Sequence, residues 1–111
     1  MTNTVAPLLD IVLEYQKACN NCFYACLKEE DHVKHMTECI RLDRECADLC
    51  GLVLDFSQRE SALLPEILEL CAKACDACAA ECETHDMDHC QRCAKACRTC
   101  AEACRAYIAQ L

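Results

Sequence analysis

The sequence predicts an all-α fold: an antiparallel up-down-up-down four-helix bundle with a cysteine-lined core. Two observations indicate it. Cysteine and aliphatic residues recur at alternating spacings of three and four, which is the period of an amphipathic helix, and no segment shows the alternation of a strand. With 111 residues the chain has room for one hydrophobic core and not for two, so residues 1–111 form a single domain.

The first half of the chain contains two predicted helices. The first spans residues 7–29, with Pro7 in its first turn, where the missing N–H of proline is tolerated. Its seam is Leu8, Val12, Tyr15, Cys19, Cys22 and Cys26. The second spans residues 32–56, and Asp31 before it is a suitable N-cap.

The second half contains two more. Ser57 and Glu60 have the spacing of a capping box, and Pro65 fits an early turn, so a third helix is predicted to run to about Glu83. The fourth runs from about His89 to the end of the chain. Because the connections are short, consecutive helices are expected to be antiparallel neighbours.

Cysteine makes up 15 of the 111 residues, a content that usually indicates a secreted, disulfide-bonded domain. Here the count is odd, and the chain has one glycine and two prolines, whereas such domains are rich in turns. The N-terminal segment MTNTVAPLLDIVLEYQ lacks a basic region and carries Asp10 within its apolar run, unlike a secretory signal. We therefore expect a cytoplasmic protein with reduced thiols.

The net charge of −8 argues against nucleic acid as a partner, because binding the phosphate backbone requires a basic surface. Apolar runs long enough to span a membrane are absent from the sequence, so no membrane partner is expected.

The cysteines of each predicted helix fall within an arc of about 40–80° at 100° per residue, and each arc coincides with the apolar seam of its helix. They are Cys19, Cys22, Cys26, Cys39, Cys46, Cys50, Cys71, Cys75, Cys78, Cys82, Cys90, Cys93, Cys97, Cys100 and Cys104. Cysteine is smaller than leucine, so a core of thiols alone would be underpacked. Neighbours on one helix are about 5–6 Å apart at Cβ, against about 3.8 Å in a disulfide, which favours metal ions over disulfides.

Cuprous copper fits this column better than zinc. A zinc ion bound by four thiolates leaves about two surplus negative charges, and several such ions in one bundle are costly. Exchange of a thiol proton for Cu(I) leaves the charge unchanged, and Cu(I) is soft and accepts two or three thiolate or thioether ligands. The sequence therefore predicts many Cu(I) ions per chain, bound by the fifteen cysteines.

One end of the bundle is predicted to be the metal entrance, because all four histidines and two methionines fall in the two connections at that end, whereas aliphatic residues fill the other. These candidates for metal entry are His32, His35, Met36, His85, Met87 and His89. Helical phase favours His32 and His35, which would continue the Cys39 stripe. Asp43 is an additional candidate, one turn from Cys39, although Leu42 is equally able to face the core.

The cysteine ladder on every helix and the His/Met end resemble the cysteine-rich four-helix-bundle copper storage proteins, over nearly the whole chain. The resemblance implies many Cu(I) ions along the bundle axis, entry at the His/Met end and a homotetramer of bundles. Family members occur both exported and cytosolic, and because the sequence shows no secretory signal we expect this chain to be one of the cytosolic members. The second helix departs from a full ladder, with Asp43 between Cys39 and Cys46.

The expected function is cytosolic Cu(I) storage and detoxification, with copper supplied by a copper chaperone. We find no catalytic constellation in the sequence and expect a protein that is not an enzyme. Two alternatives stay open: a zinc or general soft-metal buffer, and a thiol redox protein. The second is disfavoured because redox proteins use one or two exposed thiols of low pKa.

Overall fold

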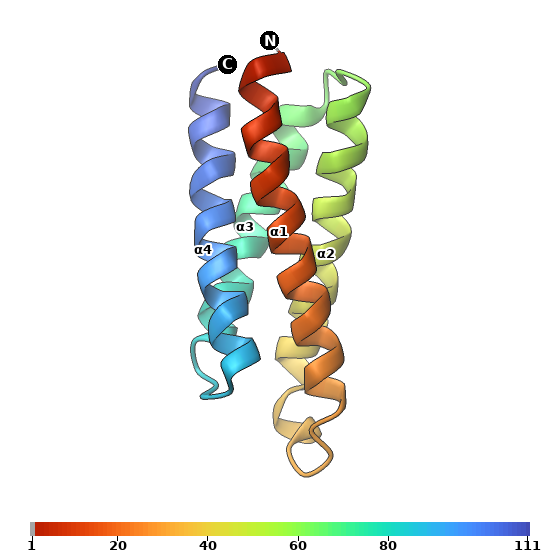
Figure 1. Ribbon diagram of the computed structural model, residues 1–111, viewed down its shortest axis with the longest axis vertical. Helices are drawn as coiled ribbons and strands as arrows, with labels where there is room; N and C mark the ends of the chain where they lie inside the picture. Colours follow the sequence, from red (N-terminus) through yellow and green to blue (C-terminus); the bar gives the residue numbers. More distant parts are fainter. Residues whose placement is uncertain (1) are drawn as a thin grey trace.

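The computed structural model describes residues 2–111. Its four α-helices are α1 (Thr2–Leu27), α2 (Thr37–Gln58), α3 (Leu64–Cys82) and α4 (Asp88–Ala109), with a short 3-10 helix, η1 (Val33–His35), before α2. Each helix packs against the next, and α4 closes the ring against α1, in a bundle of 48 × 19 × 19 Å (Figure 1). The predicted all-α antiparallel four-helix bundle is confirmed.

The chain termini and the α2–α3 connection lie at one end of the bundle, and the α1–α2 and α3–α4 connections lie at the other (Figure 1). Among residues 2–111, no helix combines the length and the apolar character needed to cross a membrane.

The predicted starts of the first two helices are wrong. Helix α1 begins at Thr2, so Pro7 lies in its second turn, where its ring removes only one backbone hydrogen bond. Helix α2 begins at Thr37, and its N-cap is Met36, not Asp31. The Met36 side chain is fully buried, and its carbonyl accepts the hydrogen bond from the Ile40 N–H at 2.8 Å. Anchoring of Met36 in the core therefore fixes where the second helix starts.

The predicted capping box at Ser57 and Glu60 is also wrong, because these residues end α2. The Ser57 hydroxyl donates to the Leu54 carbonyl at 3.0 Å. The Glu60 N–H donates to the Ser57 carbonyl and the Ser61 N–H to the Phe56 carbonyl, both at 3.2 Å, which is the pattern of a Schellman C-cap. Glu60 takes the left-handed conformation that this cap requires, with φ of 51°. Glycine usually occupies that position, which is why the sequence pattern did not indicate a helix end.

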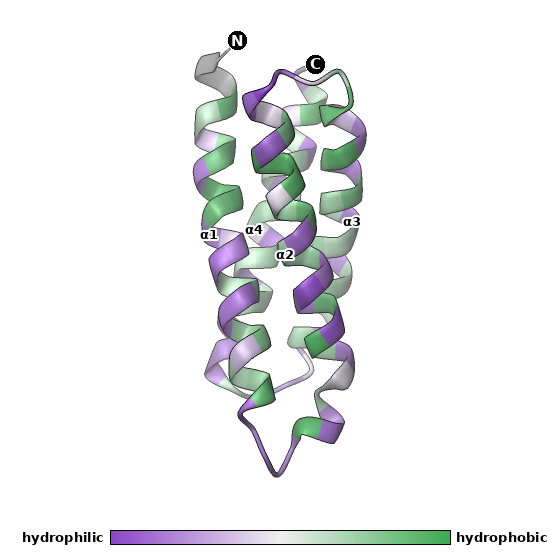
Figure 2. Ribbon diagram, turned by 90° about the vertical axis from the view of Figure 1, so that its right-hand side faces the viewer, coloured by the Kyte–Doolittle hydropathy of each residue, from purple (hydrophilic) through white to green (hydrophobic). Residues whose placement is uncertain are grey.

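Pro65 lies in the first turn of α3, as predicted. At this end of the bundle the core is aliphatic. The loop that joins α1 to α2 at the opposite end is hydrophilic (Figure 2). The buried aliphatic residues at the closed end are Leu8, Val12, Val53, Leu64, Ile67 and Leu68. Burial of these aliphatic side chains stabilises the bundle in the absence of metal.

We therefore expect the reduced, metal-free protein to be folded and helical, and its stability to depend on the aliphatic end. Leu68→Ala removes a fully buried side chain and should lower the free energy of unfolding by about 2–5 kcal/mol. Leu70→Ala is the matched control, since Leu70 lies on the same helix with 53% of its surface exposed. Circular dichroism during urea unfolding measures both; a coil spectrum for the metal-free parent would contradict the expectation.

Candidate metal centre

All fifteen cysteine side chains are fully buried, and all are free thiols. Each helix directs its cysteines to the axis because they occupy its seam, while ion pairs such as Arg41 with Glu38 and Glu45 lie on the outer surface. The predicted inward direction of the cysteines is confirmed. The interior of the bundle is a column of sulfur atoms.

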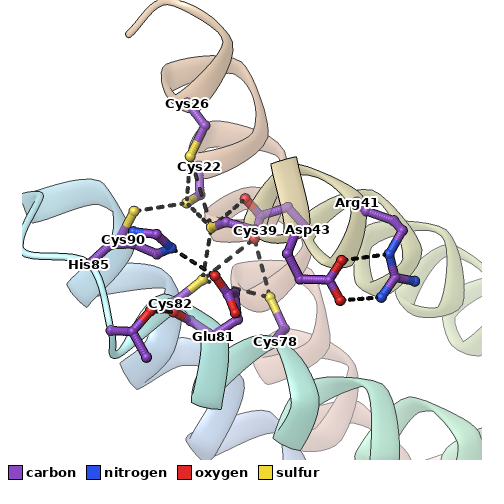
Figure 3. Close-up of polar contacts among 12 residues, drawn as sticks. Cys22, Cys26, Cys39, Arg41, Asp43, Cys78, Glu81, Cys82, His85 and Cys90 are labelled. Atoms are coloured by element: carbon purple, nitrogen blue, oxygen red, sulfur yellow. Dashed lines mark hydrogen bonds and ion pairs between the residues drawn. The ribbon is translucent and has the colours of Figure 1, made fainter. Parts of the chain in front are cut away.

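Sulfur atoms from different helices are in contact along this column (Figure 3). The Sγ of Cys39 on α2 lies 3.5 Å from the Sγ of Cys82 on α3 and 3.9 Å from that of Cys22 on α1. Cys22 is also 3.9 Å from Cys90 on α4. All four helices therefore supply thiols to one level of the bundle, where a soft metal ion has several ligands within reach.

Five groups of potential ligands have donor atoms that all lie within 4.8 Å of one another. Four of these groups overlap in the half of the bundle near the two hydrophilic connections, and the fifth lies in the other half. They are Cys19, Cys78, Cys93 and Cys97; Cys22, Cys26, His89 and Cys90; Cys22, Asp43, Cys82 and Cys93; Cys22, Cys26, Cys39 and Asp43; and Cys50, Cys71 and Cys100. Because the first four share members, they form one extended cluster and not four separate sites.

Asp43 is a fully buried carboxyl group inside this cluster. Its Oδ1 accepts a hydrogen bond from the Cys78 thiol at 3.2 Å, and its Oδ2 lies 3.7 Å from the Sγ of Cys39 (Figure 3). The Cys93 thiol also donates to Oδ1, at 3.4 Å. The sequence left open whether Asp43 or Leu42 faces the core. Asp43 faces it, and Leu42 is buried as well. Burial raises the pKa of Asp43 to about 8.

The pKa is raised for nine of the fifteen thiols, which holds them in the protonated form, and lowered for the other six. Hydrogen bonds with neighbouring thiols and then burial raise the pKa of Cys19 and of Cys100 far above the usual thiol value. A thiol must lose its proton to bind a metal as thiolate. Metal uptake by the column therefore releases protons.

His89 is the histidine that reaches the thiols. Its Nδ1 lies 3.4 Å from the Sγ of Cys22, 3.6 Å from that of Cys90 and 4.0 Å from that of Cys26. Its Nε2 faces the opposite way, 3.6 Å from the Glu29 carboxylate. The ring thus lies between the sulfur column and the solvent-exposed connection.

None of the other three histidines belongs to a group of close potential ligands. His32 and His35 are exposed and do not continue the Cys39 stripe, because the 3-10 turn between them and α2 breaks the helical phase on which that expectation rested. The Nε2 of His85 pairs with the Glu81 carboxylate at 2.8 Å. Met36 is buried in the core, and Met87 is half-buried against it. The sequence had favoured His32 and His35 over the better placed His89.

Comparison with known proteins decides the family. The family model described as copper storage protein matches residues 1–109. The chain belongs to the copper storage protein family. The cysteine-rich protein YhjQ of Bacillus subtilis (strain 168) is 52% identical over 85 residues, which cover 77% of this chain and 78% of the relative.

Two solved structures of the family show the same bundle. The Cu(I)-bound copper storage protein BsCsp3 is 48% identical, with a TM-score of 0.85 over 93% of this chain and 96% of the other. The protein Ccsp of Streptomyces lividans, described as a cytosolic copper storage protein, was solved with 10 copper equivalents. It is 36% identical, with a TM-score of 0.92 over 98% of this chain and 86% of the other. The resemblance stated from the sequence is confirmed.

The raised pKa of Asp43 predicts a pH dependence of the metal-free copper storage protein. The native carboxyl keeps its proton up to about pH 8, whereas the unfolded one loses it near pH 3.9, so between these values the native state binds more protons. Asp43 therefore lowers the free energy of unfolding as the pH rises from about 4 to 8. Asp43→Asn should remove this contribution and be the more stable variant at pH 8, by about 2–5 kcal/mol.

Urea unfolding of parent and variant at pH 5 and pH 8, with reductant and a chelator present, measures the difference. Subtraction of the two curves cancels the other titrating groups that they share. Equal pH slopes for both proteins would show that Asp43 is ionised in the native state.

Proposed function

We propose that the protein stores Cu(I) in the thiol column of its bundle and so limits free copper in the cytoplasm. The observation that carries the proposal is the burial of fifteen free thiols in one column. Thiolate is the preferred ligand of Cu(I), and a column of contacting thiols allows successive ions to share ligands. The Cu(I)-bound relative and the relative with 10 copper equivalents support the same function.

The proposed ligands are the fifteen cysteines, together with His89 and Asp43 toward the hydrophilic end. These two residues are the non-cysteine members of the ligand groups. Neutral imidazole binds Cu(I) less tightly than thiolate does, so it suits capture and transfer at the entrance. His32, His35 and Met87 are placed to meet incoming copper before it reaches His89.

Electrostatics favour Cu(I) over zinc here. Each Cu(I) that replaces a thiol proton leaves the interior charge as it was, whereas zinc bound by four thiolates adds negative charge in a region with no buried cation among the described residues. The alternative of a general soft-metal buffer is thereby disfavoured. A thiol redox role is disfavoured as well, since such a role needs an exposed thiol and all fifteen are buried.

We further propose a binding and release function without catalysis, in the cytoplasm. The cytosolic description of the Streptomyces lividans relative supports that location. Delivery of Cu(I) by a copper chaperone suits an entrance lined by histidine and methionine, because ligand exchange needs an acceptor group at the surface. Assembly as a homotetramer stays a prediction from the family resemblance.

The first test of the proposal is capacity. Anaerobic titration of the reduced protein with Cu(I) should saturate near one ion per thiol, at roughly a dozen or more ions per chain, because shared thiolates serve two ions each. Metal analysis after gel filtration measures the number. Saturation at one or two equivalents would reject storage and favour a chaperone or regulatory site, and equal uptake of zinc would favour a general buffer.

The second test is the entrance. His89→Ala should slow Cu(I) transfer from a small chelator several-fold while leaving most of the final capacity, since all cysteines remain. The double change His32→Ala/His35→Ala is the matched control: both residues are exposed at the same end and are expected to have the smaller effect. Stopped-flow absorbance of the Cu(I)-thiolate bands follows the rate. If His89→Ala loads as fast as the parent, copper does not enter past His89.

A further inference from the structure

Tyr15 places a phenol hydroxyl inside the sulfur column. It lies on the seam of α1, one turn beyond Cys19 toward the closed end, and only 1% of its surface is exposed. Its hydroxyl is buried and has no hydrogen-bond partner within the described chain. A buried polar group without a partner is unfavourable, so such a group calls for an explanation.

The hydroxyl lies at the level of thiols from two other helices. The side chain of Gln16, next to Tyr15, donates to the Ala47 carbonyl at 3.3 Å, and the Cys46 thiol donates to the Ala74 carbonyl at 3.1 Å. Tyr15 of α1, Cys46 of α2 and Cys75 of α3 therefore occupy one level of the column. Neither cysteine belongs to a group of close potential ligands. Along the axis they lie between the extended cluster, which includes Cys19 and Cys97, and the separate group at the closed end.

The seam of α1 differs from the other three at this level. Beyond Cys19, α1 continues with Tyr15, Val12 and Leu8, while the other helices continue with thiols as far as Cys50, Cys71 and Cys104. At the closed end, therefore, three helices supply thiols and the fourth supplies a phenol. Phenylalanine would fill the same space, so the hydroxyl is the feature that packing does not explain.

A thiol is a weak hydrogen-bond acceptor, whereas a thiolate is a charged and strong one. On the proposed function, Cu(I) binding converts these cysteines to thiolates: each thiol releases its proton to solvent, and Tyr15 keeps its own. We propose that Tyr15 is a positioning residue of the copper store, whose hydroxyl donates a hydrogen bond to the copper-bound thiolates of Cys46 and Cys75 and so stabilises copper between the two thiol groups. The hydroxyl lacks a partner in the metal-free protein and gains one on loading.

Tyr15→Phe tests the proposal, with Tyr24→Phe as the matched control. Both lie on α1, and Tyr24 is 62% exposed on the outer surface. In competition with a Cu(I) chelator, Tyr15→Phe should bind as many ions as the parent, but a subset of them about tenfold more weakly, the loss typical of one hydrogen bond to a charged group. Tyr24→Phe should bind like the parent.

The dependence on Cys46 and Cys75 is tested by a double-mutant cycle. In a Cys46→Ala/Cys75→Ala background, Tyr15→Phe should cause no further weakening. A parent that stops at one or two equivalents contradicts the storage function itself. If the parent binds the full number of ions and Tyr15→Phe gives the same competition curve, only the role of Tyr15 is overturned. The same holds if Tyr15→Phe changes only the stability of the metal-free protein.

Spectroscopy of the hydroxyl gives a second readout that keeps Tyr15 in place. The chain has three tyrosines and no tryptophan, so the variant Tyr24→Phe/Tyr107→Phe leaves Tyr15 as the sole phenol. Its ultraviolet resonance Raman doublet should change from that of a free hydroxyl to that of a strong donor as Cu(I) is added. A doublet that stays the same from the metal-free to the fully loaded protein would overturn the proposal.

Discussion

The packing and stability of the rest of the molecule depend on the thiol column. A four-helix bundle is normally held together by large aliphatic side chains along its axis. Here cysteine occupies these core positions over most of the length of the bundle. Cysteine contributes less buried apolar surface than leucine, so this part of the core adds less to folding. The bundle compensates at the closed end, where Leu8, Val12, Val53 and Leu68 pack together.

The surface adds little to this stability. Its ion pairs, such as Arg98 with Glu83 and Arg105 with Asp76, involve side chains that are about half exposed, and pairs of that kind contribute about 0–1 kcal/mol each. The net charge of −8 also opposes compaction. Division of the core into a thiol part and an aliphatic part therefore separates two requirements: one part accommodates metal, and the other keeps the chain folded without it.

Polar groups inside the column are few, and each occupies a distinct level. His89 lies at the hydrophilic end, Asp43 lies among the thiols of all four helices, and Tyr15 lies where the α1 ladder stops. Hydrogen bonding and ionisation of these groups change when neighbouring thiols become thiolates. On the proposed function, these groups give the thiol column a direction, from an entrance at the hydrophilic end to a closed interior.

Periodicity determined much of this protein from sequence alone. The four helices, the inward direction of every cysteine and the two unlike ends follow from local geometry, because 100° per residue fixes which side chains share a face. The resemblance to copper storage proteins rested on the same ladder. Nothing in that pattern required knowledge of how the helices pack.

Tertiary contacts determined the features of the site that helical periodicity does not specify. The 3-10 turn at Val33–His35 and the burial of Met36 took His32 and His35 out of helical phase, and lateral packing of α4 against α1 brought His89 to Cys22. Both Leu42 and Asp43 are buried, because neighbouring helices cover a wider arc of α2 than the cysteine stripe alone. Contacts between segments far apart in the chain decide which loop residue reaches the thiols and which polar group lies among them. Such contacts produce no periodic pattern in the sequence.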